Sequence, residues 1–422
     1  MLTAPTWTYS AAGGPNPFIV PARGGLIAAA INTESGATVV GLGRTATRFS
    51  RPLKLESRGV AIFAQPAPMT LPDHVWAIGY STSAGVSPRL VAITCDGNTP
   101  LDVARPELGW REGRSVVVTE TRNGPVLHID DRHLVLDMAG EVVADIPRPG
   151  SDAPYAVTSR RLFAFDGSAI VCVDLVSGAI RSRIPLDGRP TALRADPSAL
   201  RLAVRLERVL CSMDLDDASA LPKIRAFIGG LASAPNTHDA HLRMIPGMPA
   251  RLECLNDDGE SQWSFAPHGA TVVQGSGFFV GGETLAQAAT HQGERVYVLR
   301  DGECIFERAQ AGQPLVAGAL ARISERVAIV VSPGMQPSEP ITFSTNIDLV
   351  NVRGGGALVF ERPSPGGTHP QRLLAVDAAG ALIVEIAEGG AGGRWAAASD
   401  GLLAIPRSNA ARIDLYDTGA PA

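Results

Sequence analysis

Two short groups of histidine and aspartate carry the side chains best suited to acid–base or metal chemistry. One comprises His238, Asp239 and His241, which lie in a predicted loop or at the start of a strand. A neighbouring acid and base could exchange protons with a bound substrate, so these three are the candidate catalytic residues. They form a site only if the fold gathers them at the mouth of a cavity.

The second group contains His128 and Asp130, whose side chains are of the types that bind metal ions. Alternation along one strand would place His128 and Asp130 on one face, with Asp131 and His133 on the other. At most two of these side chains could then reach one ion, whereas protein metal sites take three or more ligands. No metal centre is therefore expected, and polar loop or strand residues are the simpler interpretation of both groups.

Two further motifs resemble known site sequences but lack the elements that such sites need. Residues 41–46 match the G-x-G-x-x-A form of a dinucleotide-binding turn, yet Pro52 follows and no helical pattern is present. Without a helix N-terminus the pyrophosphate has no anchor. Residues 79–83 resemble a nucleophile elbow, but they end in serine and no helix follows. Neither nucleotide binding nor a catalytic serine is predicted.

Turns that contain aspartate and glycine recur between apolar strands about every forty residues. The repeated unit that they mark is the framework that must position the candidate site residues. The aspartate can bond the turn backbone, and the glycine can take the positive φ of the reversal. A unit of this size is typical of the four-stranded blade of a β-propeller. The turn positions are Gly97, Gly140, Gly178, Asp217, Gly259 and Gly302.

The repeat resembles that of β-propellers with YVTN-type or quinoprotein-like, WD-like sequences. The resemblance implies an all-β propeller fold, and counting the repeat units predicts seven or eight four-stranded antiparallel blades in a single domain, residues 1–422. It implies no particular activity, because one fold supports many functions. Quinoproteins of this kind place a tryptophan near the end of each outer strand, and only Trp263 occupies that position, so no cofactor is expected. The copies lie at 90–103, 133–146, 162–206, 252–265, 296–308 and 373–386.

The two ends of the chain are predicted to complete one blade. Strands at 394–399, 402–406 and 412–416 leave that blade one strand short, and residues 7–9 could supply the fourth. Such a closure leaves no sheet edge open.

The period breaks at residues 309–370. Strands at 347–352 and 357–361 are predicted to form a hairpin within an inserted segment, 333–370, which begins with a proline-rich loop. Loops of this kind commonly bind partners. Residues 284–292 carry the most convincing helix formers of the chain.

Charge and composition limit the function further. The chain has 37 basic and 42 acidic residues, so no strong field favours nucleic acid or an anionic membrane. No run of eighteen apolar residues and no signal-peptide pattern is present, so the cytoplasm is the expected location. Five cysteines, an odd number, agree with reduced thiols. Almost all basic residues are arginine, which is typical of a GC-rich bacterial genome.

The sequence therefore favours a non-catalytic, cytoplasmic scaffold that binds protein partners through loops on a propeller face and through segment 333–370. It could serve as a subunit of a multi-gene bacterial system. The alternative is a propeller enzyme, either a hydrolase, a lactonase or a lyase. Its site would lie at the mouth of the central channel and would use His238, Asp239 and His241.

Overall fold

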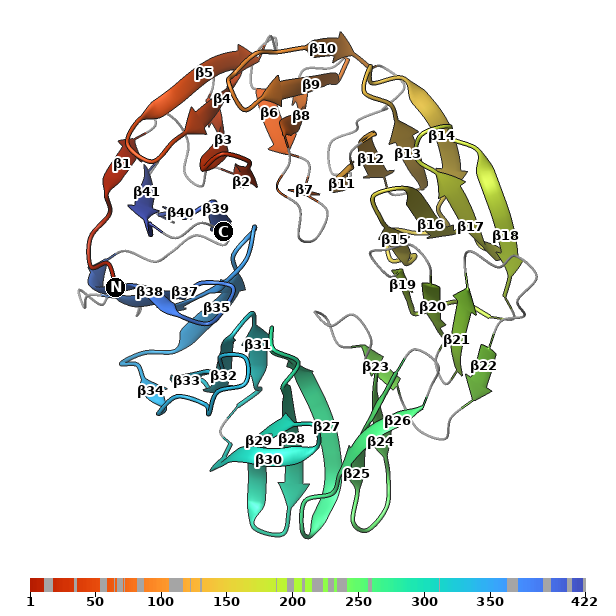
Figure 1. Ribbon diagram of the computed structural model, residues 1–422, viewed down its shortest axis with the longest axis vertical. Helices are drawn as coiled ribbons and strands as arrows, with labels where there is room; N and C mark the ends of the chain where they lie inside the picture. The colour runs from red at the N-terminus through yellow and green to blue at the C-terminus, as the bar shows by residue number, and fades with distance from the viewer. Residues whose placement is uncertain are drawn as a thin grey trace. The chain divides into compact units, whose positions relative to one another are not determined.

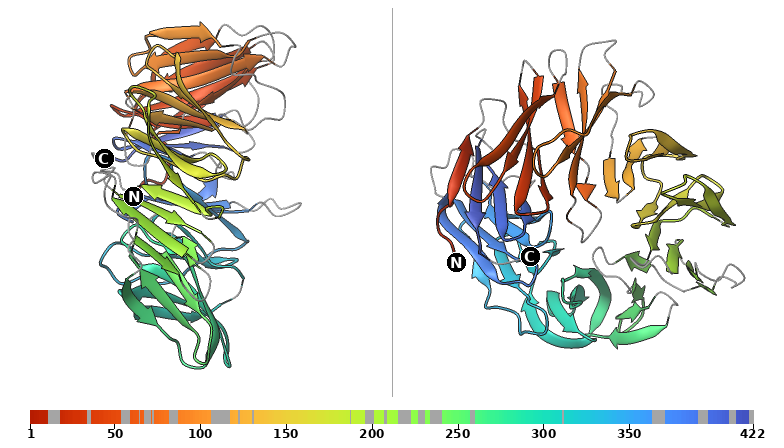
Figure 2. Two further views of the ribbon diagram at one scale, coloured as in Figure 1. Left: turned by 90° about the vertical axis from the view of Figure 1, so that its right-hand side faces the viewer. Right: turned by 45° about the horizontal axis from the view of Figure 1, so that its top comes forward.

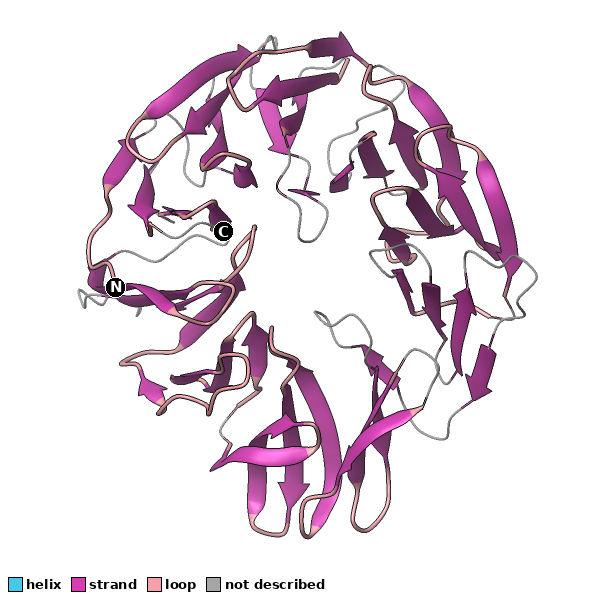
Figure 3. Cartoon of the chain, viewed as in Figure 1, coloured by secondary structure: helices cyan, strands magenta, loops and turns pink. Residues whose placement is uncertain are grey.

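The computed structural model describes most of the 422-residue chain. The residues outside the description are 11–17, 34–35, 54–58, 64, 67–70, 72, 82–86, 106–116, 122, 130, 187, 196–200, 207–208, 215–222, 227–230, 234–240, 257–259, 311, 363–370, 390–395, 408–411 and 420–422. Every regular element among the described residues is a β-strand (Figure 3). The part of the chain that is described holds no helix able to span a membrane.

The chain divides into two compact units. The terminal unit comprises residues 2–189, 352–354 and 392–422, and the central unit comprises residues 190–351 and 355–391, with Met1.

The strands of the terminal unit are labelled in Figure 1. They are β1 (Trp7–Ser10), β2 (Phe18–Ala22), β3 (Leu26–Thr33), β4 (Gly36–Leu42), β5 (Thr47–Leu53), β6 (Gly59–Phe63), β7 (Gln65–Pro66), β8 (His74–Ser81), β9 (Arg89–Thr94), β10 (Leu101–Ala104), β11 (Val117–Thr121), β12 (Gly124–Ile129), β13 (Arg132–Leu136), β14 (Val142–Pro147), β15 (Tyr155–Val157), β16 (Arg161–Phe165), β17 (Ala169–Asp174), β18 (Ile180–Pro185), β39 (Ala397–Ser399), β40 (Leu402–Pro406) and β41 (Arg412–Asp417).

The central unit holds the remaining described strands. They are β19 (Ala192–Ala195), β20 (Arg201–Arg205), β21 (Val209–Asp214), β22 (Lys223–Ala226), β23 (Leu231–Ser233), β24 (His241–Ile245), β25 (Arg251–Leu255), β26 (Ser261–Phe265), β27 (Ala270–Phe278), β28 (Thr284–Thr290), β29 (Gly293–Arg300), β30 (Glu303–Ala309), β31 (Leu315–Ala317), β32 (Leu320–Ser324), β33 (Val327–Val330), β34 (Ile341–Thr342), β35 (Ile347–Asn351), β36 (Ala357–Glu361), β37 (Gln371–Val376) and β38 (Leu382–Gly389).

These strands form antiparallel sheets in which chain neighbours are usually also hydrogen-bonded neighbours (Figure 1). Each sheet has four strands, except that β7 adds a short parallel fifth strand beside β11. A four-stranded antiparallel meander is the blade of a β-propeller, so the predicted fold class is confirmed. That the whole chain forms a single domain stays a prediction.

The described residues form ten such sheets, and the expected number of seven or eight is not confirmed. The discrepancy lies in the last third of the chain. There the sheets β31–β34 and β35–β38 both precede the sheet that contains β39–β41. The first of them connects its third and fourth strands through the loop 331–340, without an aspartate–glycine turn. Because that signal is missing, two ordinary sheets look like an interruption of the repeat.

Two sequence predictions in this region are wrong. The hairpin of β35 and β36 is not an insertion, because both strands continue into β37 and β38 as one regular sheet. Residues 284–290 form strand β28 and not a helix, since β28 pairs along its whole length with β27 and β29. Local helix propensity is a weak preference, and tertiary pairing overrides it here.

Residues 352–354 belong to the terminal unit and are hydrogen-bonded to its C-terminal part. The Arg353 backbone N–H donates to Ala396 (2.9 Å), and Ala398 N–H donates to the Arg353 carbonyl (2.7 Å). The Arg353 guanidinium donates to the Ile19 carbonyl (3.1 Å) and lies 4.4 Å from the centre of the Phe18 ring. Burial lowers the pKa of Arg353 to about 10. This arginine therefore ties its turn to β2 and β39.

The predicted pairing of the two chain ends is confirmed. Strand β1 lies antiparallel to β41, with Trp7 opposite Leu415, and completes the sheet of β39–β41. Figure 2 (right) shows the red N-terminal strand against the blue C-terminal strands. The fully buried Asp414 carboxylate accepts bonds from Thr8 (3.0 Å), Arg412 (2.6 Å) and Arg407 (2.6 Å). It thereby links β1, β41 and Arg407, the residue that follows β40.

The recurrent turn glycines pack one sheet against the next. Gly97, Gly140, Gly178 and Gly302 have φ values of 86°, 74°, 68° and 83°, as the repeat predicts. An added Cβ would lie 2.6 Å from Cβ of Phe49 at Gly97, and 2.9 Å from Cβ of Trp263 at Gly302. Phe49 lies on β5 and Trp263 lies on β26, and each of these strands is the outer strand of the preceding sheet. Glycine is therefore required both for the reversal and for close approach.

The turn aspartates behave as the sequence predicts. Oδ1 of Asp137 accepts the backbone N–H groups of Ala139 and Glu141, both at 2.9 Å. Oδ1 of Asp174 accepts those of Val176 (3.0 Å) and Ser177 (2.9 Å). These bonds satisfy the amides that the reversal leaves unpaired.

The middle strands β12 and β13 of the sheet β11–β14 are buried on both faces. On the sheet that contains β12 and β13, Val126 and Val135 pack with Leu162 of the following sheet. Leu127 and Leu134 pack on the opposite face with residues of the preceding sheet. Two-sided burial explains why these strands read as continuous apolar runs with little alternation.

Replacing Gly178 by alanine should destabilise the terminal unit by about 2–5 kcal/mol, because the new Cβ would overlap the Val143 carbonyl and alanine disfavours a φ of 68°. Gly334→Ala is the matched control. Its φ is 71°, but no heavy atom lies within 4 Å of the added Cβ. Urea unfolding measures both, and equal losses would contradict the packing role of the Gly178 turn.

Asp414→Asn should destabilise the terminal unit by about 3 kcal/mol, because two arginines lose a buried counter-charge. Amide hydrogen exchange should also accelerate in β1. Asp417→Asn, which alters a more exposed pair with Arg44, should cost about 0–1 kcal/mol. Unchanged exchange at residues 7–10 would show that Asp414 does not hold the first strand.

Candidate functional site

The structure describes one member of the predicted catalytic group. His241 is the first residue of β24, it is buried, and it lies opposite Leu255 and Ser233 on the neighbouring strands. His238 and Asp239 lie outside the described residues. Whether the three side chains meet is therefore untested, and a catalytic role for them stays a prediction.

The structure brings His128 and His133 together. The two Nδ1 atoms are 2.7 Å apart, and both side chains are fully buried. The alternation argument placed these residues on opposite faces, which is wrong. A turn separates them, so β12 and β13 run antiparallel and the two histidines are directly opposite. Directly opposite residues of a hairpin share a face. Asp130 lies outside the described residues.

The hydrogen bonds of this pair leave His128 unavailable to a metal ion. One Nδ1 must donate and the other accept, while Nε2 of His128 contacts the Thr119 hydroxyl at 3.0 Å. Nε2 of His133 is buried and has no hydrogen-bond partner. In the described part of the chain, no three His, Cys, Asp or Glu side chains are grouped to hold a metal ion.

Tyr155 and Arg148 complete the surroundings of the pair. The Tyr155 ring stacks on His128 with centroids 3.8 Å apart, and the Arg148 guanidinium carbon lies 5.6 Å from the tyrosine centroid. Burial lowers the pKa of His128 well below its ordinary 6.5, and the charges of His133 and Arg148 act in the same direction. Burial, with Arg148, lowers the pKa of His133 to about 3. Both rings are neutral at pH 7.

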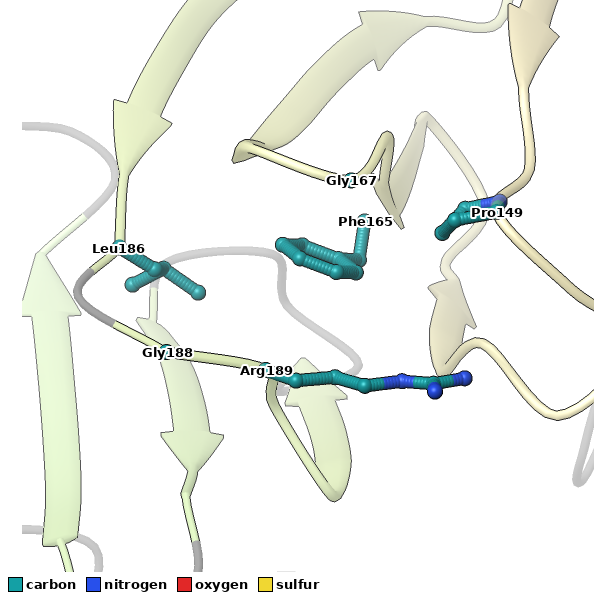
Figure 4. Close-up of a pocket in the computed structure, with 6 residues that line it drawn as sticks. All are labelled: Pro149, Phe165, Gly167, Leu186, Gly188 and Arg189. Carbon is teal, nitrogen blue, oxygen red and sulfur yellow. The ribbon is translucent and has the colours of Figure 1, made fainter.

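A shallow hollow lies on the loops at one end of sheet β15–β18 (Figure 4). It has a volume of about 380 Å³. Its one charged lining side chain, Arg189, pairs with the exposed Asp152 at 2.7 Å. The lining offers no nucleophile and no general base, so this hollow could hold a small group but could not catalyse a reaction on it. The lining residues are Pro149, Phe165, Gly167, Leu186, Gly188 and Arg189.

In the central unit, a buried carboxylate fixes an exposed loop. Oε1 of Glu283 accepts the Gly334 backbone N–H (3.1 Å) and the Arg300 guanidinium (3.2 Å), while Arg300 also donates to the Met335 carbonyl. Only 2% of Glu283 is exposed. Gly281 lies close to the same loop, since a Cβ there would stand 2.7 Å from Cα of Pro333. Glu283 itself and the backbone at Gly281 thus both lie against the loop 333–335.

This arrangement presents two apolar side chains to solvent. Val280 is 46% exposed and Met335 is 63% exposed. We call these two residues, with the loop 333–335 and Glu283 beneath it, the Val280–Met335 surface. The sequence predicted a loop at 333–340 but missed Glu283 and Arg300, because nothing local links charges seventeen residues apart. The two consecutive glycines before Glu283 are the sequence feature that indicates close packing of another chain segment at this point.

Comparisons with known proteins concern the fold alone. No family model and no curated protein matches the sequence. BamB from Moraxella catarrhalis is 13% identical with a TM-score of 0.39, and the match covers 90% of this chain and 97% of that one. A eukaryotic initiation factor is 9% identical with a TM-score of 0.49, and covers 92% and 91%. The β-propeller domain of Cps50 (Swd1) from Myceliophteria thermophila is 13% identical with a TM-score of 0.35, and covers 73% and 97%.

Glu283→Gln should free the loop 333–335 and destabilise the central unit by about 1–3 kcal/mol, because a buried arginine contact and a charge-assisted backbone bond are weakened. Limited proteolysis and urea unfolding would detect the two effects. Glu294→Gln, at an exposed glutamate of β29, should change neither. Wild-type resistance of the loop to protease in Glu283→Gln would contradict the anchoring role.

Proposed function

We propose that this protein is a non-catalytic scaffold that binds a protein partner through the Val280–Met335 surface. The observation that supports the proposal is the fixed exposure of two apolar side chains above a buried carboxylate. Contiguous exposed apolar groups mark interaction surfaces, and Gly281, next to Val280, lies close to Pro333 of the loop that carries Met335. The backbone N–H groups of Gly334 and Met335 and the Met335 carbonyl, in contrast, already have partners inside the protein.

The physical properties of the surface suit binding. A loop that is already ordered loses little conformational entropy when it meets a partner, so more of the contact energy becomes affinity. Methionine adapts its shape to an apolar pocket, and methionine is enriched at protein interfaces. The loop 333–335 of this surface lies within segment 333–370, where the sequence predicts partner binding.

The proposal also includes the cellular location of the protein and the kind of system to which it belongs. We place the protein in the cytoplasm as a subunit of a multi-gene bacterial system, with binding through loops at the sheet ends. The balance of 37 basic and 42 acidic residues favours protein partners over nucleic acid or membranes. An enzyme that uses His238, Asp239 and His241 is the alternative that the test must separate from this one.

The double variant Val280→Ser/Met335→Ser should lose its partner, with at least about a tenfold drop in affinity, because two apolar contacts of about 1 kcal/mol each disappear. Tagged intact protein would capture the partner from native lysate, and chemical crosslinking with mass spectrometry would map the contact. Purified partner would then give the two affinities.

The matched control is Met138→Ser/Val176→Ser, which removes exposed apolar side chains of the same types from two turns of the terminal unit. This variant should bind like wild type. Equal binding by all three proteins, with crosslinks elsewhere, would contradict the proposed surface. A bound small molecule with no stoichiometric protein would favour the enzyme instead.

A further inference from the structure

The histidine pair occupies the joint between two sheets of the terminal unit. His128 and His133 project from the sheet β11–β14, and Tyr155, the first residue of β15, stacks on His128 and meets His133 edge-on at 5.3 Å. Val126 and Val135, on the same face as the histidines, pack with the core of sheet β15–β18. The pair is thus the polar part of an otherwise apolar contact between sheets.

The groups that face the pair cannot neutralise an added proton. Strand β11 contributes the Thr119 hydroxyl, and β15 contributes the Tyr155 ring. Arg148 lies between β14 and β15. It lowers the pKa of both histidines and is itself positively charged.

The residues that β14, β16 and β17 contribute to the core of this joint are apolar, and the turn carboxylate Asp131 is exposed. The apolar side chains are Ile146, Leu162, Ala164, Val171 and Val173.

The geometry of the pair also resists protonation. Each Nδ1 already takes part in the contact between the rings, and Nε2 of His128 is bonded to Thr119. The nitrogen left over, Nε2 of His133, has no acceptor for a proton placed on it. A proton at any position therefore leaves a buried cation without a counter-ion, beside a second cation at Arg148.

We propose that the His128–His133 pair is an acid-sensitive joint, which holds the sheets β11–β14 and β15–β18 together at neutral pH and loosens when either ring gains a proton. Loosening would release β15 and the segment 148–154 that precedes it. Pro149 of this segment lines the hollow of Figure 4, so the hollow would change shape with the joint.

The pH range of the effect follows from linkage. In the unfolded chain both histidines have a pKa near 6.5, whereas in the folded protein the pKa of His133 is about 3 and that of His128 is well below 6.5. The open or unfolded state therefore binds more protons below pH 6.5. Stability of the joint is complete above that pH and falls as the pH is lowered towards 3.

Hydrogen exchange on the intact protein tests the proposal. Between pH 7 and pH 5, after correction for intrinsic exchange, the opening constant of amides in β12, β13 and β15 should rise roughly 25-fold for His133 alone. Strands β3 and β4 of the same unit serve as the internal reference. Equal changes in the two sets of strands would overturn the proposal. This experiment uses the wild-type protein alone.

The variant His128→Phe/His133→Leu keeps the stacked ring and the apolar volume but cannot titrate. Its β12, β13 and β15 amides should show the reference pH dependence. The control variant His268→Gln/His291→Gln removes an exposed histidine pair with centroids 6.0 Å apart and should behave like wild type. The proposal would also be overturned if the variant His128→Phe/His133→Leu, which cannot titrate at this joint, opened at pH 5 to the wild-type extent.

Discussion

Close approach of a turn glycine to the preceding outer strand is the constraint on which the repeated packing depends. At Gly140 a Cβ would lie 3.0 Å from side-chain carbons of Leu101 and Leu90, and at Gly302 it would lie 2.9 Å from Trp263. The same contact recurs in both units, so at these turns one sheet is positioned by the turn of the next. The residue beneath the glycine varies from leucine to tryptophan, because only the backbone approach has to be preserved.

The sequence predicts the features that this constraint makes local. Gly97, Gly140, Gly178 and Gly302 recur because each must combine a positive φ with a missing side chain, and both demands fall on one residue. The pairing of β1 with β41 was also predictable, because three strands at the C-terminus left one position unfilled.

What failed depended on contacts distant in sequence. The sheet β31–β34 lacks the turn signal, and the helix formers at 284–290 are held in a sheet by strands on both sides. His128 and His133 were assigned to opposite faces because alternation applies along one strand and stops at a turn. The contact between Glu283 and the loop 333–335 has no local signal beyond the two glycines that precede Glu283. Site residues of this kind become visible only when the backbone is known.

The buried carboxylates of this protein hold its strands and loops in place. Asp414 holds the first strand, Glu283 holds the loop 333–335, and Glu361 accepts the backbone N–H groups of Thr345 (3.2 Å) and Arg372 (2.8 Å). A carboxylate that is enclosed and bonded to the backbone is poorly placed to accept a proton from a substrate. Among the described residues, the buried acids thus serve construction, and what they fix in place, above all Met335, is what a partner would meet.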